Sequence, residues 1–191
     1  MTDVEELADT LRALAEALDA MGAEWAVCGS LASTTYGEPR ATNDIDVVAA
    51  LSVAQARQVA RALMGDFYAD EDMAAEAAER GASFNVIHEK TFLKVDLFLP
   101  PPGPMGRGQL DRRRRLELMP GVEVPVLGPE DTVLQKLRWF ANTGETSDRQ
   151  WRDLLSVVRA VELDRPFLAA RAAGAGLTPL LEQLLAEAQE D

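Results

Sequence analysis

The sequence contains one cysteine and one histidine among 191 residues, and these scarcities exclude several classes of protein. Cys28 alone can form neither an internal disulfide nor a cysteine cluster for zinc, and we interpret it as a small buried hydrophobic residue. His88 lies in a predicted strand without a nearby ligand partner, so we interpret it as structural. A serine hydrolase would need a histidine base beside an elbow-like nucleophile, and Ser30 has neither. A P-loop NTPase is excluded because no Gly-x-x-x-x-Gly-Lys-Ser/Thr motif is present.

Long apolar runs are absent as well. No stretch approaches the ~20 residues that a membrane-spanning helix needs. The first six residues are acidic and lack the basic start and continuous apolar stretch of a secretory signal peptide. Hydrophobic residues nevertheless make up 47% of the sequence, as is usual for a globular protein. We therefore expect a cytoplasmic protein with no membrane partner.

Basic residues are few, because 19 lysines and arginines stand against 32 aspartates and glutamates and give a net charge of −13. Such a charge repels polyanions at long range, which argues against a general nucleic-acid-binding surface. One short segment differs, since it holds five arginines and only one acid, Asp111. The arginines are Arg107, Arg112, Arg113, Arg114 and Arg115. They form either a solvated face or a contact surface for phosphate groups or RNA.

The most informative segment of the chain runs from Val27 to Val48. A short apolar strand leads into Gly29-Ser30, and thirteen residues separate Ser30 from Asp44. Side chains two apart on a strand point the same way, so Asp44 and Asp46 share one face. Adjacent carboxylates repel unless a cation neutralises them, and such an oxygen pair suits Mg²⁺. A strand-to-helix turn at Gly29-Ser30 can hold a phosphate with backbone N–H groups and a hydroxyl.

The hydrophobic periodicity predicts alternating strands and helices over the first two thirds of the chain and helices alone over the last third. The loop from Tyr36 to Asn43 would deliver Arg40 and Thr42 close to the carboxylate pair. Predicted strands cover residues 24–28, 45–49, 83–88, 92–99 and 123–127. Predicted helices cover residues 3–21, a segment starting near 30, 52–64 with a capping box, 71–79, 129–140, 147–161, 166–173 and 178–190.

A third carboxylate follows on a later strand. Odd positions from Leu93 to Leu99 are all aliphatic and predict a buried face, which leaves Asp96 on the opposite face. At this point the chain resembles the DNA polymerase β-like nucleotidyltransferase superfamily. The signature of that superfamily is an apolar strand, Gly-Ser, a spacer, Asp-x-Asp and an aspartate on a later strand. The resemblance implies an α/β (α+β) nucleotidyltransferase fold, in which a mixed sheet is flanked by helices and followed by a C-terminal helical part. It also implies that Asp44, Asp46 and Asp96 are catalytic, metal-binding residues.

Two later segments, 129–140 and 147–155, are similar to the minimal nucleotidyltransferases of abortive-infection and type IV toxin–antitoxin systems. Members of that toxin family carry a lysine on a helix after the sheet and an aspartate on the next helix. These correspond here to Lys136 and Asp153. Each also has an ordinary interpretation, because Lys136 could be solvated and Asp153 could pair with Arg149 four residues earlier. We expect a catalytic core over 1–127 and a helical subdomain over 128–191.

The resemblance implies transfer of NMP from an NTP to an acceptor hydroxyl, with release of pyrophosphate. Two Mg²⁺ ions, or Mn²⁺ in their place, would be held by Asp44, Asp46 and Asp96. Asp153 would position Lys136 or the acceptor. The nucleotide would be bound by Gly29, Ser30, Arg40, Thr42 and Lys136.

The sequence leaves the acceptor open among RNA, protein and small molecules. The toxin-family resemblance and the run from Arg112 to Arg115 favour tRNA or another RNA, and the family implies an antitoxin partner. Two alternatives are a catalytically inactive nucleotide-binding protein of the same fold and a protein-interaction module. In the second case the docking face would be the leucines of the last predicted helix, Leu180, Leu181, Leu184 and Leu185.

Overall fold

Seven strands form one mixed sheet in the computed structural model, which describes residues 4–42, 44–100, 108–144 and 146–190. Their order across the sheet is β3-β4-β5-β2-β1-β7-β6. The strands are β1 (Glu24–Cys28), β2 (Asp44–Ala50), β3 (Phe67–Tyr68), β4 (Ser83–His88), β5 (Lys94–Phe98), β6 (Arg114–Met119) and β7 (Val122–Val126). The helices of the described residues are α1 (Val4–Ala20), α2 (Gly29–Tyr36), α3 (Val53–Leu63), α4 (Glu71–Arg80), α6 (Pro129–Asn142), α7 (Asp148–Ala160), α8 (Arg165–Gly174) and α9 (Thr178–Glu187).

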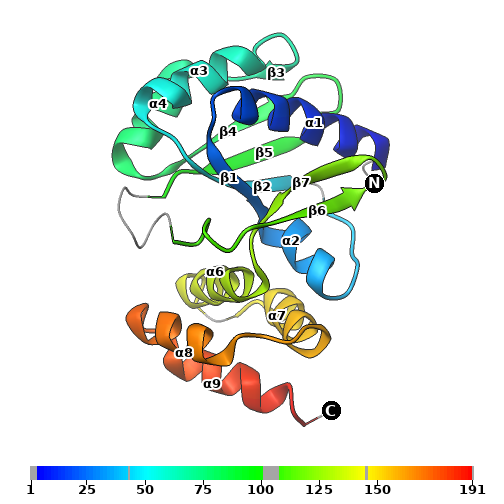
Figure 1. The fold of residues 1–191 in the computed structure, drawn as a ribbon, viewed down its shortest axis with the longest axis vertical. Helices are drawn as coiled ribbons and strands as arrows, with labels where there is room; N and C mark the ends of the chain where they lie inside the picture. Colours follow the sequence, from blue (N-terminus) through cyan, green and yellow to red (C-terminus); the bar gives the residue numbers. More distant parts are fainter. Residues whose placement is uncertain (1–3, 43, 101–107, 145, 191) are drawn as a thin grey trace.

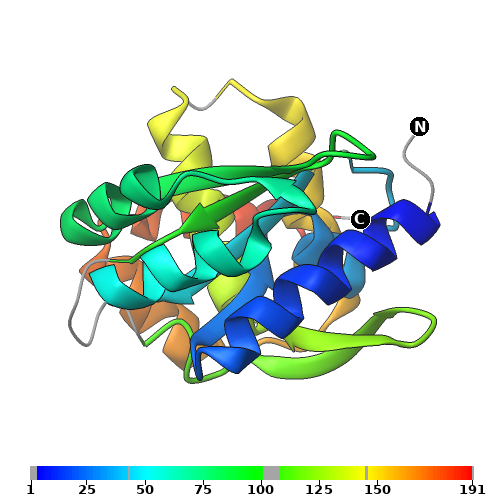
Figure 2. The ribbon, with the colours of Figure 1, turned by 90° about the horizontal axis from the view of Figure 1, so that it is seen from above.

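The sheet is the middle layer of the molecule (Figures 1 and 2). On one side α3 packs against α1 and α4, and these three helices cover the sheet. On the other side α2 contacts α6 and α7, and α8 and α9 lie farthest from the sheet. This arrangement confirms the predicted mixed α/β fold with a helical C-terminal part.

Alternating side chains decide which face of the central strands is buried. Ile45 and Val47 of β2 and Val95 and Leu97 of β5 are fully buried, as their period of two predicts. Trp25 and Cys28 of β1 are also buried, which confirms both as core residues. The polar positions between the aliphatic ones therefore point to the opposite face of the sheet, where the site is built.

Three strands differ from the sequence prediction, and one of them, the two-residue strand β3, was not predicted at all. β6 was missed because its charged residues look like a loop, yet Arg114 and Arg115 begin an edge strand antiparallel to β7. The strand predicted from Phe92 starts at Lys94 instead, since Phe92 has a positive φ of 56° and closes the turn with a hydrogen bond to His88 O. The predicted capping box at Ser52 is confirmed, because its hydroxyl accepts from Gln55 N.

The start of α6 joins the helical part to the segment before β6. Glu130 is 2% exposed, accepts a hydrogen bond from Asp164 N, and forms an ion pair with Arg112 at 3.2 Å. The Arg112 guanidinium also lies 4.2 Å from the centre of the Phe167 ring. Arg112 is therefore held by contacts within the protein, and this holds independently of the other arginines between residues 107 and 115.

The change from sheet to helices falls between the end of β7 and Pro129, while the division into two domains stays a prediction. In α9, Leu181 and Leu184 are buried in the chain's own core. None of the helices that the structure describes combines the length and apolar character needed to cross a bilayer.

Candidate active site

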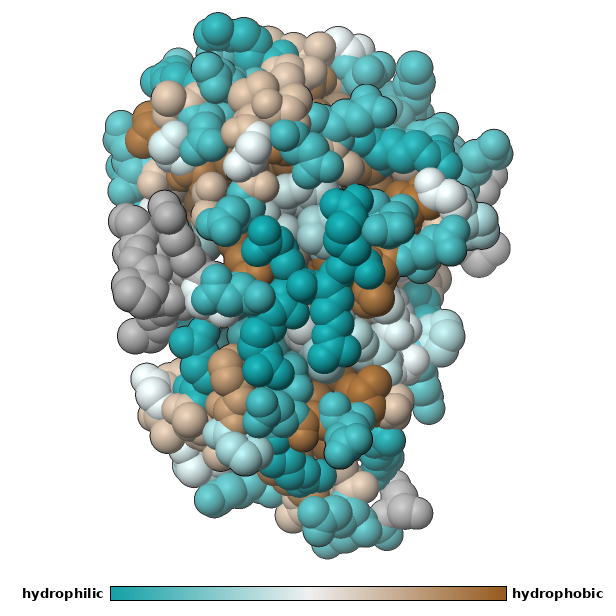
Figure 3. Space-filling model, viewed as in Figure 1, coloured by the Kyte–Doolittle hydropathy of each residue, from teal (hydrophilic) through white to brown (hydrophobic). Residues whose placement is uncertain are grey.

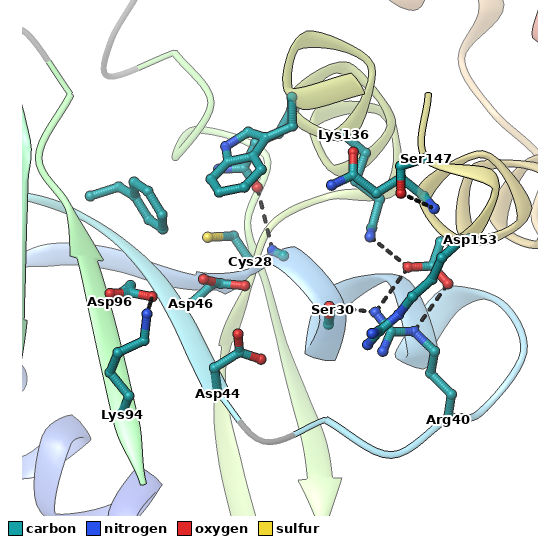
Figure 4. Close-up of a pocket in the computed structure, with 16 residues that line it drawn as sticks. Cys28, Ser30, Arg40, Asp44, Asp46, Lys94, Asp96, Lys136, Ser147 and Asp153 are labelled. Atoms are coloured by element: carbon teal, nitrogen blue, oxygen red, sulfur yellow. Dashed lines mark hydrogen bonds and ion pairs between the residues drawn. The ribbon is translucent and has the colours of Figure 1, made fainter. Parts of the chain in front are cut away.

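Three carboxylates meet on one face of the central strands. β2 runs parallel to β5, and Asp46 lies beside Asp96 in register, with Asp44 beside Lys94. All three aspartates line a cavity of about 370 Å³ (Figure 4). The structure thus brings together the pair predicted from Asp-x-Asp and the third carboxylate predicted from the alternation on β5.

Burial and neighbouring charges both act on the Asp46 carboxyl group. Burial, and then the charges of Asp44 and Asp96, raise its pKa from 3.8 to about 6. A backbone hydrogen bond from Ser30 and the charge of Lys136 oppose this rise. A cation bound between these carboxylates would lower the pKa of Asp46, because it would offset the repulsion from Asp44 and Asp96.

The turn from β1 to α2 brings the backbone against that carboxylate. Gly29 has φ +60°, and a Cβ built on it would collide with the Asp46 side chain. Only glycine avoids both the left-handed strain and this clash. Gly29 N–H is directed to Gln135 Oε1 at 3.4 Å, and Ser30 lines the same cavity. The predicted phosphate-binding turn is thus adjacent to the predicted metal-binding pair.

Two neighbours hold the outer carboxylates. The Thr42 hydroxyl donates to Asp44 Oδ1 at 2.7 Å, and Thr42 is 9% exposed. It supports Asp44 from behind and is not among the residues that line the cavity. Lys94 Nζ lies 2.6 Å from Asp96 Oδ2, and this hydrogen bond is the main reason that the pKa of Lys94 is raised.

A network of two cations and one carboxylate forms the opposite wall of the cavity (Figure 4). Arg40 Nε and one terminal nitrogen each donate to the Asp153 carboxylate at 3.0 Å, and the same nitrogen donates to Ser30 Oγ at 2.6 Å. Lys136 Nζ donates to Asp153 Oδ2 at 2.8 Å. Burial alone would raise the pKa of Asp153, but the hydrogen bonds from Arg40 and Lys136 outweigh it and hold that pKa below its usual range.

This network decides between the interpretations that the sequence left open. Lys136 is 8% exposed and therefore not solvated. Asp153 pairs with Arg40 and Lys136, so the ordinary helix pair with Arg149 is wrong. The two cations lie beside the predicted phosphate-binding turn, and the role that the toxin-family resemblance implies for Lys136 stays a prediction.

Several cavity residues were not predicted from the sequence. Gln135 precedes Lys136 on α6, and Lys94 precedes Asp96 on β5, but neither has a motif of its own. Phe98 and Trp139 meet edge to face with ring centres 6.2 Å apart, which only the packing of α6 near β5 reveals. The wall is completed by Ser147, Arg149 and Gln150 at the start of α7.

The donor set suits a divalent cation. Carboxylate oxygens are the ligands that Mg²⁺ and Mn²⁺ prefer, and three of these side chains line the same cavity. Within the described part of the chain, no three His, Cys, Asp or Glu side chains already form a group that could hold a metal ion. Lys94 pairs with Oδ2 of Asp96, so a cation held by all three aspartates would compete with this lysine for the Asp96 carboxylate.

The family model described as nucleotidyl transferase AbiEii toxin, type IV TA system, matches residues 12–186. No curated protein matches the sequence.

Solved structures share the fold at low sequence identity. An antigenic nucleotidyltransferase-like protein from Paracoccidioides brasiliensis superposes with a TM-score of 0.59 and 19% identity, covering 97% of this chain and 94% of the other. A protein from Thermotoga maritima assigned as a nucleotidyltransferase gives 0.52 and 18%, covering 80% and 96%. The antibiotic-resistance factor ANT(2″)-Ia gives 0.52 and 13%, covering 95% and 90%. At such identities these matches establish the fold alone.

Proposed function

Because the chain belongs to the AbiEii nucleotidyltransferase toxin family of type IV toxin–antitoxin systems, we propose that its cavity transfers an NMP group from an NTP to an acceptor hydroxyl. The family match makes the protein a nucleotidyltransferase; the metal, the acceptor and the toxin role belong to the proposal. The observation that carries it is the convergence of Asp44, Asp46 and Asp96 opposite the Arg40–Asp153–Lys136 network. The side of the cavity proposed to bind metal, with the three aspartates, thus faces the side proposed to bind phosphate, with Arg40 and Lys136.

The reaction forms a bond between the acceptor oxygen and Pα while the bond from Pα to the bridging oxygen of the β-phosphate breaks. Pyrophosphate leaves with the electron pair, and the proton lost by the hydroxyl passes to the Asp96 carboxylate. Gly29 and Ser30 hold the β- and γ-phosphates with backbone N–H groups and a hydroxyl. Lys136 and Arg40 offset the charge that develops on the leaving group.

Two Mg²⁺ ions, or Mn²⁺ in their place, would be held by Asp44, Asp46 and Asp96. When bound, they would neutralise the triphosphate and lower the pKa of the acceptor hydroxyl. Thr42 acts in this scheme by holding Asp44 rather than by touching the nucleotide. Asp153 positions Arg40 and Lys136 toward the phosphates.

The acceptor is RNA, a protein or a small molecule, and the type IV family implies a toxin with an antitoxin partner. The arginine run supports RNA only weakly, because most of it has partners within the protein. Arg112 pairs with Glu130, Arg113 donates to Leu110 O, and Arg115 pairs with Glu123. An inactive or purely interacting protein is disfavoured, since all three carboxylates converge and the inner leucines of α9 are buried.

Calorimetry of NTP binding tests the metal requirement. Three carboxylates repel a triphosphate, so we expect Mg²⁺ to strengthen binding at least tenfold over EDTA. Asp46→Asn removes one of the repelling charges and should bind NTP in EDTA more tightly than the wild type does. Asp66→Asn, outside the cavity, is the matched control and should behave as wild type. Equal wild-type affinity in Mg²⁺ and in EDTA would contradict a metal-dependent site.

A further inference from the structure

Several residues of the cavity have no part in binding metal or phosphate in the proposed function. Among them, Phe98 and Trp139 are aromatic, and Ser147, Arg149 and Gln150 lie at the start of α7. An aromatic ring next to a hydrogen-bonding side chain is the combination with which proteins recognise a nucleobase. The base of the incoming NTP is also the one part of that substrate for which the proposed function names no binding residue.

Helices α6 and α7 form an antiparallel pair beside the cavity. Lys136 of α6 is hydrogen-bonded to Asp153 of α7 at 2.8 Å. Nearer to the loop that connects the helices, the rings of Phe140 and Trp151 have their centres 5.1 Å apart. Positions that follow Lys136 on α6 therefore lie level with positions that precede Asp153 on α7.

This pairing places an aromatic ring and an amide one turn above the phosphate-binding side. Trp139 follows Lys136 by three positions, and Gln150 precedes Asp153 by three. Three residues advance a helix by about 4.5 Å and return to nearly the same face. Figure 4 shows Ser147, at the start of α7, on the side of the Lys136–Asp153 pair that faces away from the aspartates of β2. A nucleotide whose phosphates lie at Lys136 thus has its base within reach of Trp139 and Gln150.

The Trp139 ring is positioned for stacking. Its side chain is 49% exposed, and Phe98 supports it edge to face with ring centres 6.2 Å apart. A ring that is already held by packing loses little conformational freedom when a planar ligand covers it. Stacking does not distinguish between the four bases, because every base has an aromatic face. Trp139 therefore contributes affinity rather than selectivity.

Gln150 has the chemistry for selectivity. Its backbone N–H donates to the Ser147 hydroxyl at 3.4 Å, which fixes the residue in the first turn of α7. The Oε1 atom of its side chain is buried and has no hydrogen-bond partner among the residues that the structure describes. A buried acceptor without a partner is costly, and an N–H group of a ligand would relieve that cost.

An acceptor of this kind distinguishes the bases by the donors they present. Adenine, cytosine and guanine each carry an exocyclic amino group that projects beyond the ring. Uracil has only a ring N–H between two carbonyl oxygens, and Gln150 Oε1 would repel these oxygens. Gln150 therefore favours a base with an amino group over uracil.

The arginine run does not provide this selectivity. Figure 3 shows strongly hydrophilic side chains across the middle of the molecule, where residues 108–115 pass in Figure 1. Arginine side chains bind phosphate groups, which all four NTPs share. Charge on this face of the molecule is therefore neutral with respect to the base.

We propose that Trp139 stacks on the base of the incoming NTP and that Gln150 Oε1 accepts a hydrogen bond from the amino group of that base, so that the site selects against UTP. The inference rests on the proposed nucleotidyl transfer and adds which residues recognise the donor nucleotide. Trp139 and Gln150 contact the substrate, whereas Phe98 is a positioning residue that acts through Trp139.

Calorimetry in Mg²⁺ with the α,β-methylene analogues of ATP, GTP, CTP and UTP tests the inference. The bridge between Pα and Pβ of these analogues cannot be cleaved, so binding is measured without transfer. Gln150→Leu removes the acceptor at similar side-chain size, Trp139→Ala removes the ring, and Trp139→Phe keeps an aromatic ring. Gln58→Leu, at an exposed position of α3 outside the cavity, is the matched control. Melting temperatures establish that each variant is folded.

We expect the wild type to bind at least one of the three amino-bearing nucleotides about tenfold or more tightly than the UTP analogue. In Gln150→Leu this difference should fall below about threefold, because leucine accepts no hydrogen bond. Trp139→Ala should weaken binding of the preferred nucleotides about tenfold and keep their ranking, and Trp139→Phe should retain most of the affinity. Gln58→Leu should bind all four as the wild type does.

A second comparison isolates the amino group and needs no variant. The preferred nucleotide is replaced by the same nucleotide without its amino group, with purine for adenine, hypoxanthine for guanine or 2-pyrimidinone for cytosine. The wild type should lose about fivefold or more in affinity, since Gln150 Oε1 again lacks a partner. In Gln150→Leu the same replacement should cost less than about twofold.

The inference is overturned if the wild type binds all four analogues equally or the UTP analogue most tightly. It is also overturned if Gln150→Leu keeps the wild-type selectivity, or if removal of the amino group leaves wild-type affinity unchanged. Each of these results leaves nucleotidyl transfer standing, because the metal and phosphate sites do not depend on the base. Absence of Mg²⁺-dependent binding for all four nucleotides would instead refute the proposed function, and the inference with it.

Discussion

Asp96→Asn should reduce nucleotidyl transfer at least a thousandfold, which corresponds to about 4 kcal/mol of transition-state stabilisation. The amide keeps the shape of the side chain but neither accepts the hydroxyl proton nor contributes negative charge to a cation. NTP binding should stay within about threefold of wild type, because in the proposed function the phosphates are held by the opposite wall, where Arg40 and Lys136 lie. Single-turnover transfer and calorimetry on the same preparation measure the two effects separately.

Lys94→Gln is the companion variant for Asp96. It removes the ion pair at 2.6 Å and leaves the carboxylate in place. If Lys94 only occupies Asp96 until a cation binds, Lys94→Gln should retain transfer and need less Mg²⁺ for half-maximal rate. Wild-type turnover by Asp96→Asn would show instead that Asp96 is not the third catalytic carboxylate.

Asp153→Asn should raise the KM for NTP about 10- to 100-fold, with a smaller effect on kcat. The carboxylate receives hydrogen bonds from both Arg40 and Lys136 and is 11% exposed. An amide in its place would leave the buried Lys136 and the partly buried Arg40 facing each other without a counter-charge. Both would then move away from the phosphate-binding turn, and steady-state kinetics with varied NTP would detect the loss.

A purely structural role for Asp153 would give a different pattern. In that case the melting temperature would fall while the KM for NTP stayed at its wild-type value. Asp148→Asn is the matched control, because Asp148 lies on the same helix, is exposed and does not line the cavity. It should leave both quantities unchanged.

Local patterns were sufficient to predict the carboxylate wall. Alternation on β2 and β5 fixed which face each aspartate occupies, because a strand has a strict period of two. Parallel pairing of these strands then placed Asp46 beside Asp96. The glycine at position 29 was predicted from its motif, and its positive φ and close approach to Asp46 explain why no other residue fits.

The rest of the site depends on contacts that no local pattern encodes. Arg40 and Asp153 are 113 positions apart, and their bidentate pairing arises only when α7 packs against α2. The arginine run was ambiguous for the same reason, since the partners of Arg112 come from α6 and α8. Charged edge strands such as β6 are also hard to distinguish from loops, because their side chains need not be apolar.

Label transfer from NTP tests the central claim most directly. The protein is incubated with Mg²⁺, a cell lysate and each NTP carrying ³²P at either the α- or the γ-phosphate, with Asp96→Asn and EDTA as controls. Nucleotidyl transfer predicts that α-label appears in an acceptor, that γ-label appears only in pyrophosphate, and that both controls abolish the transfer. Label from the γ-phosphate in the acceptor, or no Mg²⁺-dependent transfer of the α-label from any NTP, would contradict the account.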